Sequence, residues 1–229
     1  MNTGELQSPI LNNPRLIYIG RPNRGRDLAS LSYAIKTCHE SIKNASELLV
    51  LNDSVYWAPR ALSAFVTAAR KTRFDVTGLT SSQQHRFHLQ SYAFHFKFLS
   101  DSIILGLKSI GTYRYKRTIV HYGEKKLSRD FLRAGVKLGA LFDSSEMKLN
   151  IALYSDWYGP DIDAVAHLVE KNVALNPTIH FWPELALSAG VVKKSLLKNP
   201  ANFRLSPSDN SRLNGLLGSW GFKDLVKQL

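Results

Sequence analysis

The sequence has little cysteine, few acidic residues and no long apolar run. Its 229 residues include a single cysteine, Cys38, which excludes an intrachain disulfide and a zinc site built from several cysteines. No apolar run approaches the roughly 20 residues that a membrane-spanning helix needs. The first residues, MNTGELQSPILNNPRL, lack the apolar stretch of a signal peptide. We therefore expect a soluble, cytoplasmic protein.

Several short functional signatures are also missing. The chain contains neither GxGxxG nor GxxxxGK[ST], so the two common phosphate-loop patterns are absent. No HxxxH or HxxEH spacing occurs, and no GxSxG surrounds Ser54. His85 and His88 stand three residues apart, but no acidic or cysteine ligand accompanies them. These absences leave no common metalloenzyme or hydrolase motif in the chain.

Positive charge is abundant and unevenly spread. Lys and Arg outnumber Asp and Glu by 30 to 18, which gives a formal net charge of +12. Basic residues dominate residues 108–137 and the tail from Gly190 onward. A basic surface attracts polyanions, so nucleic acid, an anionic membrane face and phosphorylated small molecules all fit. A solvated basic surface without a specific partner explains the charge as well.

Apolar patterning predicts alternating strands and helices. Residues 16–19, 48–51 and 74–80 are typical of short strands, and helices are expected after Asp27, the predicted N-cap, and over 58–72. This order predicts an α/β fold with a mostly parallel sheet flanked by helices. No linker divides the chain. We expect one domain over 1–229, with 1–14 flexible and a helical tail at 206–229.

Polar residues follow two of the predicted strands. Asn52, Asp53 and Ser54 come directly after the apolar strand LLVL, and an arginine-rich loop, 21–27, follows the first strand. Ligands of open α/β sheets bind beyond the carboxyl ends of the strands. An acid there can hold a divalent cation that binds a diphosphate, and arginines can pair with phosphate. A polar turn that satisfies backbone groups, and a solvated loop, are the alternatives.

Five segments in order carry a family resemblance: NRGRDLASLSYAI, LLVLNDSVYWAP, VTGLTSSQQHRFHLQSYAFHF, HYGEKKLSRDFLRAGVKLGALF and NPTIHFWPELALSAGVVKKSLLKNP. Together they resemble the rhamnan synthesis protein F family of polysaccharide glycosyltransferases, over roughly residues 15–205. The resemblance implies a GT-A-like, Rossmann-like nucleotide-binding domain. Members usually have further strands before the segment that begins at Asn23, so we expect an N-terminally shortened form of this fold.

The resemblance implies transfer of a sugar, often rhamnose or a related deoxysugar, from a nucleotide-sugar donor. The acceptor would be a cell-surface polysaccharide or a lipid-linked glycan. Asp53 would be the metal-side carboxylate for Mg²⁺ or Mn²⁺, although NDS is not a DxD motif and metal dependence stays open. The predicted donor and diphosphate site comprises Arg21, Asn23, Arg24, Arg26, Asp27, Asn52, Asp53 and Ser54. The arginines would neutralise the leaving diphosphate if no metal does.

Glycosyl transfer also needs a base for the acceptor hydroxyl and groups that bind sugar. Glu124 is the predicted base, with Asp75 and Asp27 in reserve; a helix-start acid in an ion-pair network is the alternative. Sugar and acceptor contacts are predicted for His88, Gln90, Tyr92, Trp182 and Glu184. A buried polar ladder at 88–92, and a core tryptophan at 182, are the alternatives. Ser128 is the predicted N-cap of the helix that follows.

Three function classes are compatible with these sequence features. A glycosyltransferase at the anionic inner face of the membrane would use the basic stretch 108–137 for peripheral attachment. A non-catalytic scaffold in polysaccharide assembly is the second class. A nucleic-acid-binding protein is the third, but no helix-turn-helix, RNP motif or zinc finger supports it, so we expect no nucleic-acid partner.

Overall fold

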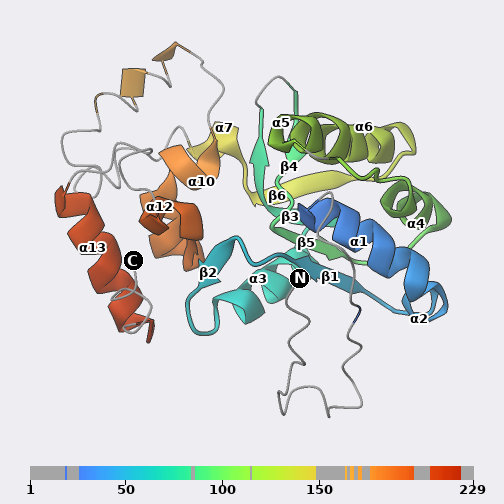
Figure 1. Cartoon of the computed structure of the whole chain (residues 1–229), viewed down its shortest axis with the longest axis horizontal. Helices are drawn as coiled ribbons and strands as arrows, with labels where there is room; N and C mark the ends of the chain where they lie inside the picture. Colours follow the sequence, from blue (N-terminus) through green and yellow to red (C-terminus); the bar gives the residue numbers. More distant parts are fainter. Residues whose placement is uncertain are drawn as a thin grey trace, which may run out of the picture.

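A computed structural model describes residues 19, 26–83, 86–113, 115–147, 163, 166–167, 170–171, 176–198 and 207–222. Within these residues, a five-stranded sheet is surrounded by helices (Figure 1). The α/β class predicted from the sequence is therefore confirmed. No helix of the described residues has both the length and the apolar character needed to cross a bilayer. The predicted strand at 16–19 lies outside the described residues, apart from Ile19.

The sheet is mixed rather than mostly parallel. Strands β1 (Leu48–Leu51), β3 (Val76–Ser82) and β6 (Leu138–Phe142) run in one direction. Strand β5 (Ala93–Phe96) inserts antiparallel between β1 and β3, so only β3 and β6 form a parallel pair among the described strands. The short β4 (His88–Leu89) pairs antiparallel with the end of β3. Strand β3 is buried along its whole length because it has neighbours on both sides.

Strand β1 is exposed along one side although its sequence, LLVL, is entirely apolar. In the described part of the chain it pairs only with β5, at the edge of the sheet. Leu49 and Leu51 are consequently 36% and 39% exposed.

Helices cover both faces of the sheet. On one face lie α1 (Arg26–Thr37), α4 (Asp101–Lys108) and α6 (Lys126–Arg133), packed on Phe94, Phe96 and other apolar side chains. On the other face lies α3 (Ala61–Lys71), whose Phe65 and Ala69 pack against Leu79 and Ala93. Residues 93–96 alternate between the two faces, as the two-residue period of a strand requires. The short α2 (His39–Lys43) follows α1.

Two helix predictions are corrected. Helix α1 begins at Arg26, so Asp27 lies in its first turn rather than at its N-cap. The helix expected to begin at Ser128 is longer: α5 (Lys116–Ile119), the π-helical turn η2 (Val120–Lys125) and α6 follow one another without a break. Ser128 lies inside α6, where its hydroxyl accepts a hydrogen bond from the backbone N–H of Leu89 (3.2 Å). It anchors β4 instead of capping a helix.

The C-terminal elements form a third core cluster. They are α10 (Pro177–His180), α11 (Trp182–Glu184), η5 (Leu185–Ala189), β7 (Val191–Lys193), α12 (Lys194–Lys198) and α13 (Pro207–Ser219). Trp182, Leu196 and Leu213 are buried in this cluster. Strand β7 pairs antiparallel with β2 (Val55–Trp57), which directly follows β1. The backbone N–H of Lys194 also donates to the carbonyl of Ser54 (3.0 Å). This pairing brings the C-terminal elements to the end of β1.

Glycine 190 makes the β2–β7 pairing possible. Its backbone φ is +64°, in the left-handed region that favours glycine. A Cβ at this position would lie 2.9 Å from the Cβ atoms of Ala58 and Ala61. The carbonyl of Gly190 accepts from the N–H of Ala58 (2.7 Å).

The remaining short helix, α7 (Ser144–Met147), follows β6. Asp143, just before it, accepts a hydrogen bond from Ser81 of β3 (2.8 Å).

Candidate functional site

A pocket of about 440 Å³ lies beyond the end of β1. Its lining comes from the start of α1, the β1–β2 turn, the β4–β5 turn, η2 and the C-terminal elements. The residues are Asp27, Leu28, Asn52, Asp53, Ser54, Val55, Gln90, Ser91, Tyr92, Ile119, Val120, Glu124, Asn176, Thr178, Lys193, Lys194, Ser195 and Lys198. The volume falls within the range of small-molecule sites.

Hydrogen bonds fix the β1–β2 turn at the floor of this pocket. The side-chain oxygen of Asn52 accepts from the backbone N–H (3.0 Å) and the hydroxyl (2.5 Å) of Ser54. The amide nitrogen of Asn52 donates to Asp27 Oδ2 (3.0 Å). Asn52 therefore ties the turn to α1. The expectation that NDS is a turn satisfying its own backbone, and the expectation that it faces a ligand site, both fit this geometry.

Asp53 stands at the exposed tip of the same turn. None of the hydrogen bonds found among the described residues engages its carboxylate. No group of three His, Cys, Asp or Glu side chains within the described ranges can hold a metal ion. The oxygen of Asn52 is already used by Ser54. Within the described residues, the turn therefore supplies one carboxylate, that of Asp53, and no preformed cluster of metal ligands.

Glu124 enters the pocket from the π-helical turn η2. Its Oε1 accepts from both the backbone N–H (2.9 Å) and the hydroxyl (2.6 Å) of Ser91. Its Oε2 lies 4.0 Å from Nε2 of His88. A π-helical turn holds one extra residue and changes the direction of the side chains that follow it. Glu124 is therefore inside a helical segment, and not before a helix as the sequence predicts.

Gly123 allows η2 to lie close to α1. A Cβ at Gly123 would lie 2.6 Å from Cδ1 of Leu28, which is itself a pocket residue. The close approach brings Glu124 and Asp27 to the same pocket.

His88 is buried behind Glu124 and is not part of the pocket lining. Its Nδ1 lies 3.0 Å from the carbonyl oxygen of Arg86. A carbonyl only accepts, so Nδ1 carries a proton and Nε2 faces Glu124. The predicted contact between His88 and sugar is replaced by a contact with the candidate base.

Gln90 and Tyr92 line the pocket and also form a buried polar ladder. Thr80 Oγ1 donates to Gln90 Oε1 (2.6 Å) and lies 2.6 Å from the Tyr92 hydroxyl. Burial raises the pKa of Tyr92 well above its usual value, and the nearby Glu124 charge raises it further. Tyr92 therefore remains a neutral phenol at physiological pH.

Asn176 extends this ladder to the C-terminal elements. It accepts from Gln90 Nε2 (3.1 Å) and caps α10 by accepting from the backbone N–H (3.1 Å) and hydroxyl (2.8 Å) of Thr178. Lys193 Nζ donates to Thr178 Oγ1 (3.2 Å). A continuous chain of hydrogen bonds thus runs from the central strand to a lysine at the pocket.

The remaining predicted site residues either are not described by the structure or do not line the pocket. Arg21, Asn23 and Arg24 lie outside the described residues. Arg26 begins α1, but its side chain is not described. Trp182 and Glu184 are buried in the C-terminal cluster and do not line the pocket, so the alternative of a core tryptophan describes Trp182. Asp75 accepts from the backbone N–H of Lys137 (2.8 Å) and is also not among the pocket residues.

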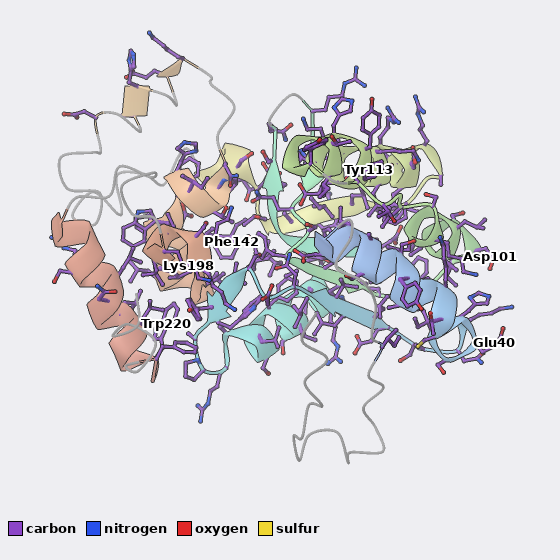
Figure 2. All side chains as sticks on the ribbon, in the orientation of Figure 1. Glu40, Asp101, Tyr113, Phe142, Lys198 and Trp220 are labelled. Carbon is purple, nitrogen blue, oxygen red and sulfur yellow. The ribbon has the colours of Figure 1, made fainter. Side chains whose placement is uncertain are left out.

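Sequence reasoning missed the cationic wall of the pocket. Lys193, Lys194, Ser195 and Lys198 come from β7 and α12, beside the β1–β2 turn. Figure 2 labels Lys198 on α12, on the side of the molecule that carries α10 and α13. Two signals were present: the basic cluster in VVKKSLLKNP and the Asn-Pro-Thr cap before α10. Neither signal indicates that these residues line the same pocket as Asn52.

The comparisons with known proteins give one curated relative. The chain is 30% identical to the uncharacterized protein y4gN of Sinorhizobium fredii (strain NBRC 101917 / NGR234) over 133 residues. This match covers 55% of this chain and 35% of the relative. The chain therefore spans about a third of the length of the protein it matches. No family model matches the chain, and no solved structure matches it.

Proposed function

We propose that the protein transfers a sugar from a nucleotide-sugar donor to a polysaccharide or lipid-linked glycan, with this pocket as the site of transfer. One observation carries the proposal. Residues that sequence analysis assigned separately to the donor (Asp27 and 52–54), the base (Glu124) and the sugar (Gln90 and Tyr92) line one pocket. They come from segments far apart in the chain, so their convergence is a property of the fold.

The geometry of Glu124 suits a general base. In the transfer, a base accepts the proton of the acceptor hydroxyl as its oxygen bonds the anomeric carbon of the sugar. The bond between that carbon and the diphosphate breaks, and the nucleoside diphosphate leaves. Ser91 occupies Oε1 with two hydrogen bonds, which fixes the carboxylate and leaves Oε2 for the proton. The side chain of Glu124 is thus held in one orientation.

The pocket also suits a sugar and an anionic donor. The side-chain amides of Asn52, Gln90 and Asn176 are of the kind that hydrogen-bond sugar hydroxyls. Lysines on the facing wall make the pocket attractive to a phosphorylated molecule. The family resemblance gives rhamnose or a related deoxysugar as the expected sugar.

The test is direct measurement of transfer. The full chain is incubated with UDP-, GDP- and dTDP-sugars and a membrane fraction or lipid-linked acceptor, and release of each nucleoside diphosphate is followed. We expect one donor to be consumed only in the presence of acceptor, and Glu124→Gln to stop the reaction. Glu40→Gln, an exposed acid on α2, is the matched control. Absence of turnover with every donor, in a folded protein, would refute the enzyme and favour the scaffold.

A further inference from the structure

The wall of the pocket formed by β7 and α12 has the composition of a phosphate site. Three lysines, Lys193, Lys194 and Lys198, fall within six consecutive residues, with Ser195 between them. All four line the pocket. The ammonium group of lysine commonly binds phosphate through its positive charge. A serine hydroxyl adds a hydrogen-bond donor with a preferred direction.

Ser195 supplies the observation that points to a ligand. Its Oγ is buried, yet it has no hydrogen-bond partner within the described part of the chain. A buried hydroxyl without a partner costs free energy, so such groups are rare in folded proteins. Ser195 lines the pocket, and a bound oxyanion would give the hydroxyl an acceptor. Binding of an oxyanion would remove the free-energy cost of the unpaired Ser195 hydroxyl, and this gain would favour binding.

Two of the lysines are held in place. Lys193 Nζ donates to Thr178 Oγ1 (3.2 Å), and Thr178 is in turn fixed by Asn176. Lys194 Nζ lies 5.2 Å from the centre of the Tyr56 ring, a cation–π contact. Lys198 is exposed and has no ion pair among the described residues. The wall therefore combines two fixed charges with one that is free to move onto a ligand.

Backbone hydrogen bonds also hold the wall next to the β1–β2 turn. Residues 191–193 of β7 pair with β2, and Lys194 N–H bonds the carbonyl of Ser54. Within the described part of the chain, no carboxylate forms an ion pair with Lys194 or Lys198. The positive charges of these two lysines are thus available to the pocket.

From these contacts we infer that Lys193, Lys194, Ser195 and Lys198 bind the diphosphate group of a ligand, and that lysine charge rather than a divalent cation neutralises it. The inference rests on the proposed function and deepens it, since the leaving group of a nucleotide-sugar donor is a nucleoside diphosphate. A diphosphate can also belong to a polyprenyl-linked acceptor. The chemistry recognised is the same in both cases.

The test uses calorimetric titration of the full chain with inorganic pyrophosphate at low salt in EDTA. We expect saturable binding, weakened about tenfold by Lys198→Gln or Ser195→Ala, because each removes a hydrogen bond to a charged group. Lys36→Gln, on the exposed face of α1, is the matched control and is expected to bind as the wild type does. Circular dichroism verifies that each variant is folded.

Further arms separate the source of the diphosphate. UDP, GDP and dTDP represent the donor, and farnesyl diphosphate represents a lipid-linked acceptor. Tighter binding of either class than of pyrophosphate supports the site and identifies its ligand. Pyrophosphate binding without sugar transfer would leave the site standing while the transferase proposal fails. The inference is overturned if pyrophosphate does not bind, if binding needs Mg²⁺ or Mn²⁺, or if Lys36→Gln weakens it equally.

Discussion

Ser91 Oγ donates to Oε1 of Glu124 at 2.6 Å, and the backbone N–H of the same serine donates to the same oxygen at 2.9 Å. Two donors from one residue restrain the carboxylate without neutralising it. Replacing Glu124 by Gln removes the charge and preserves the size of the side chain. We expect transfer to slow by about 10²–10⁴, the usual contribution of a general base, while pyrophosphate binding is retained. Single-turnover kinetics with the Glu40→Gln control measure the change; an unchanged rate would remove Glu124 from the reaction.

Ser91→Ala keeps the backbone donor and removes only the hydroxyl. A hydrogen bond to a charged group contributes about 1.5–3 kcal/mol, so we expect kcat to fall by about tenfold or more with KM little changed. Ser91→Thr retains a hydroxyl and is expected to recover part of the rate. A rise in KM with kcat unchanged would instead assign Ser91 to substrate binding.

Gly123→Ala tests the close approach of η2 to α1. The added Cβ would meet Leu28 Cδ1 at 2.6 Å, so either the buried Leu28 side chain or η2, which carries Glu124, has to shift. We expect a loss of about 1–3 kcal/mol in the free energy of unfolding and a lower transfer rate. Gly215→Ala in α13 is the control, because a Cβ there meets nothing within 4 Å. Equal melting temperatures for the two variants would contradict the close packing.

The pH dependence of the folding stability is expected to involve His180, which contacts the pocket residue Asn176. Burial lowers the pKa of His180 below its ordinary value of 6.5, and the N–H of Asn176 donates to its Nδ1 (2.9 Å). Acidification from neutral pH protonates the unfolded chain first, so folding stability is lost as the pH falls below 6.5 toward the lower folded pKa. The decrease in melting temperature between neutral pH and about pH 5 should be smaller for His180→Gln. An equal decrease in both proteins would rule out His180 as the group responsible.

Glu47 is expected to act at lower pH and away from the pocket. Hydrogen bonds from Arg70 and then from His95 lower the pKa of Glu47 from 4.5 to about 2. The stabilisation is present in full above pH 4.5 and is lost as the pH falls through about 2. Acid unfolding followed by circular dichroism should therefore be less steep in Glu47→Gln over this window. High salt should weaken the effect, because the pair with Arg70 is largely exposed.

Local signals predicted much of the polar half of the pocket. Apolar strands ending in polar residues located Asn52, Asp53 and Ser54, and helical spacing located the start of α1 near Asp27. Strand direction was not predictable in this way: β5 alternates apolar residues just as a parallel strand can, and only pairing with β1 and β3 fixes its antiparallel sense. Trp182 is equally apolar in a core or against a sugar, so composition alone did not separate the two roles.

The cationic wall needed information that no local pattern contains. Strand β7 is three residues long, and its partner β2 lies far away in the sequence. The π-helical turn that carries Glu124 likewise has no signature distinguishing it from an ordinary helix start. Both features depend on long-range packing, through Gly190 against Ala58 and Gly123 against Leu28.

The pairing of β2 with β7 has a consequence for synthesis of the protein. Strands β1 to β6 and their helices are complete before the ribosome reaches Lys193, and loop closure across so long a chain is slow. The nascent chain can therefore form the five-stranded sheet and η2, which carries Glu124, while the pocket still lacks the lysines of β7 and α12. Ligand binding becomes possible only when residues 193–198 have emerged, and any ligand present then stabilises the docking of β7 on β2.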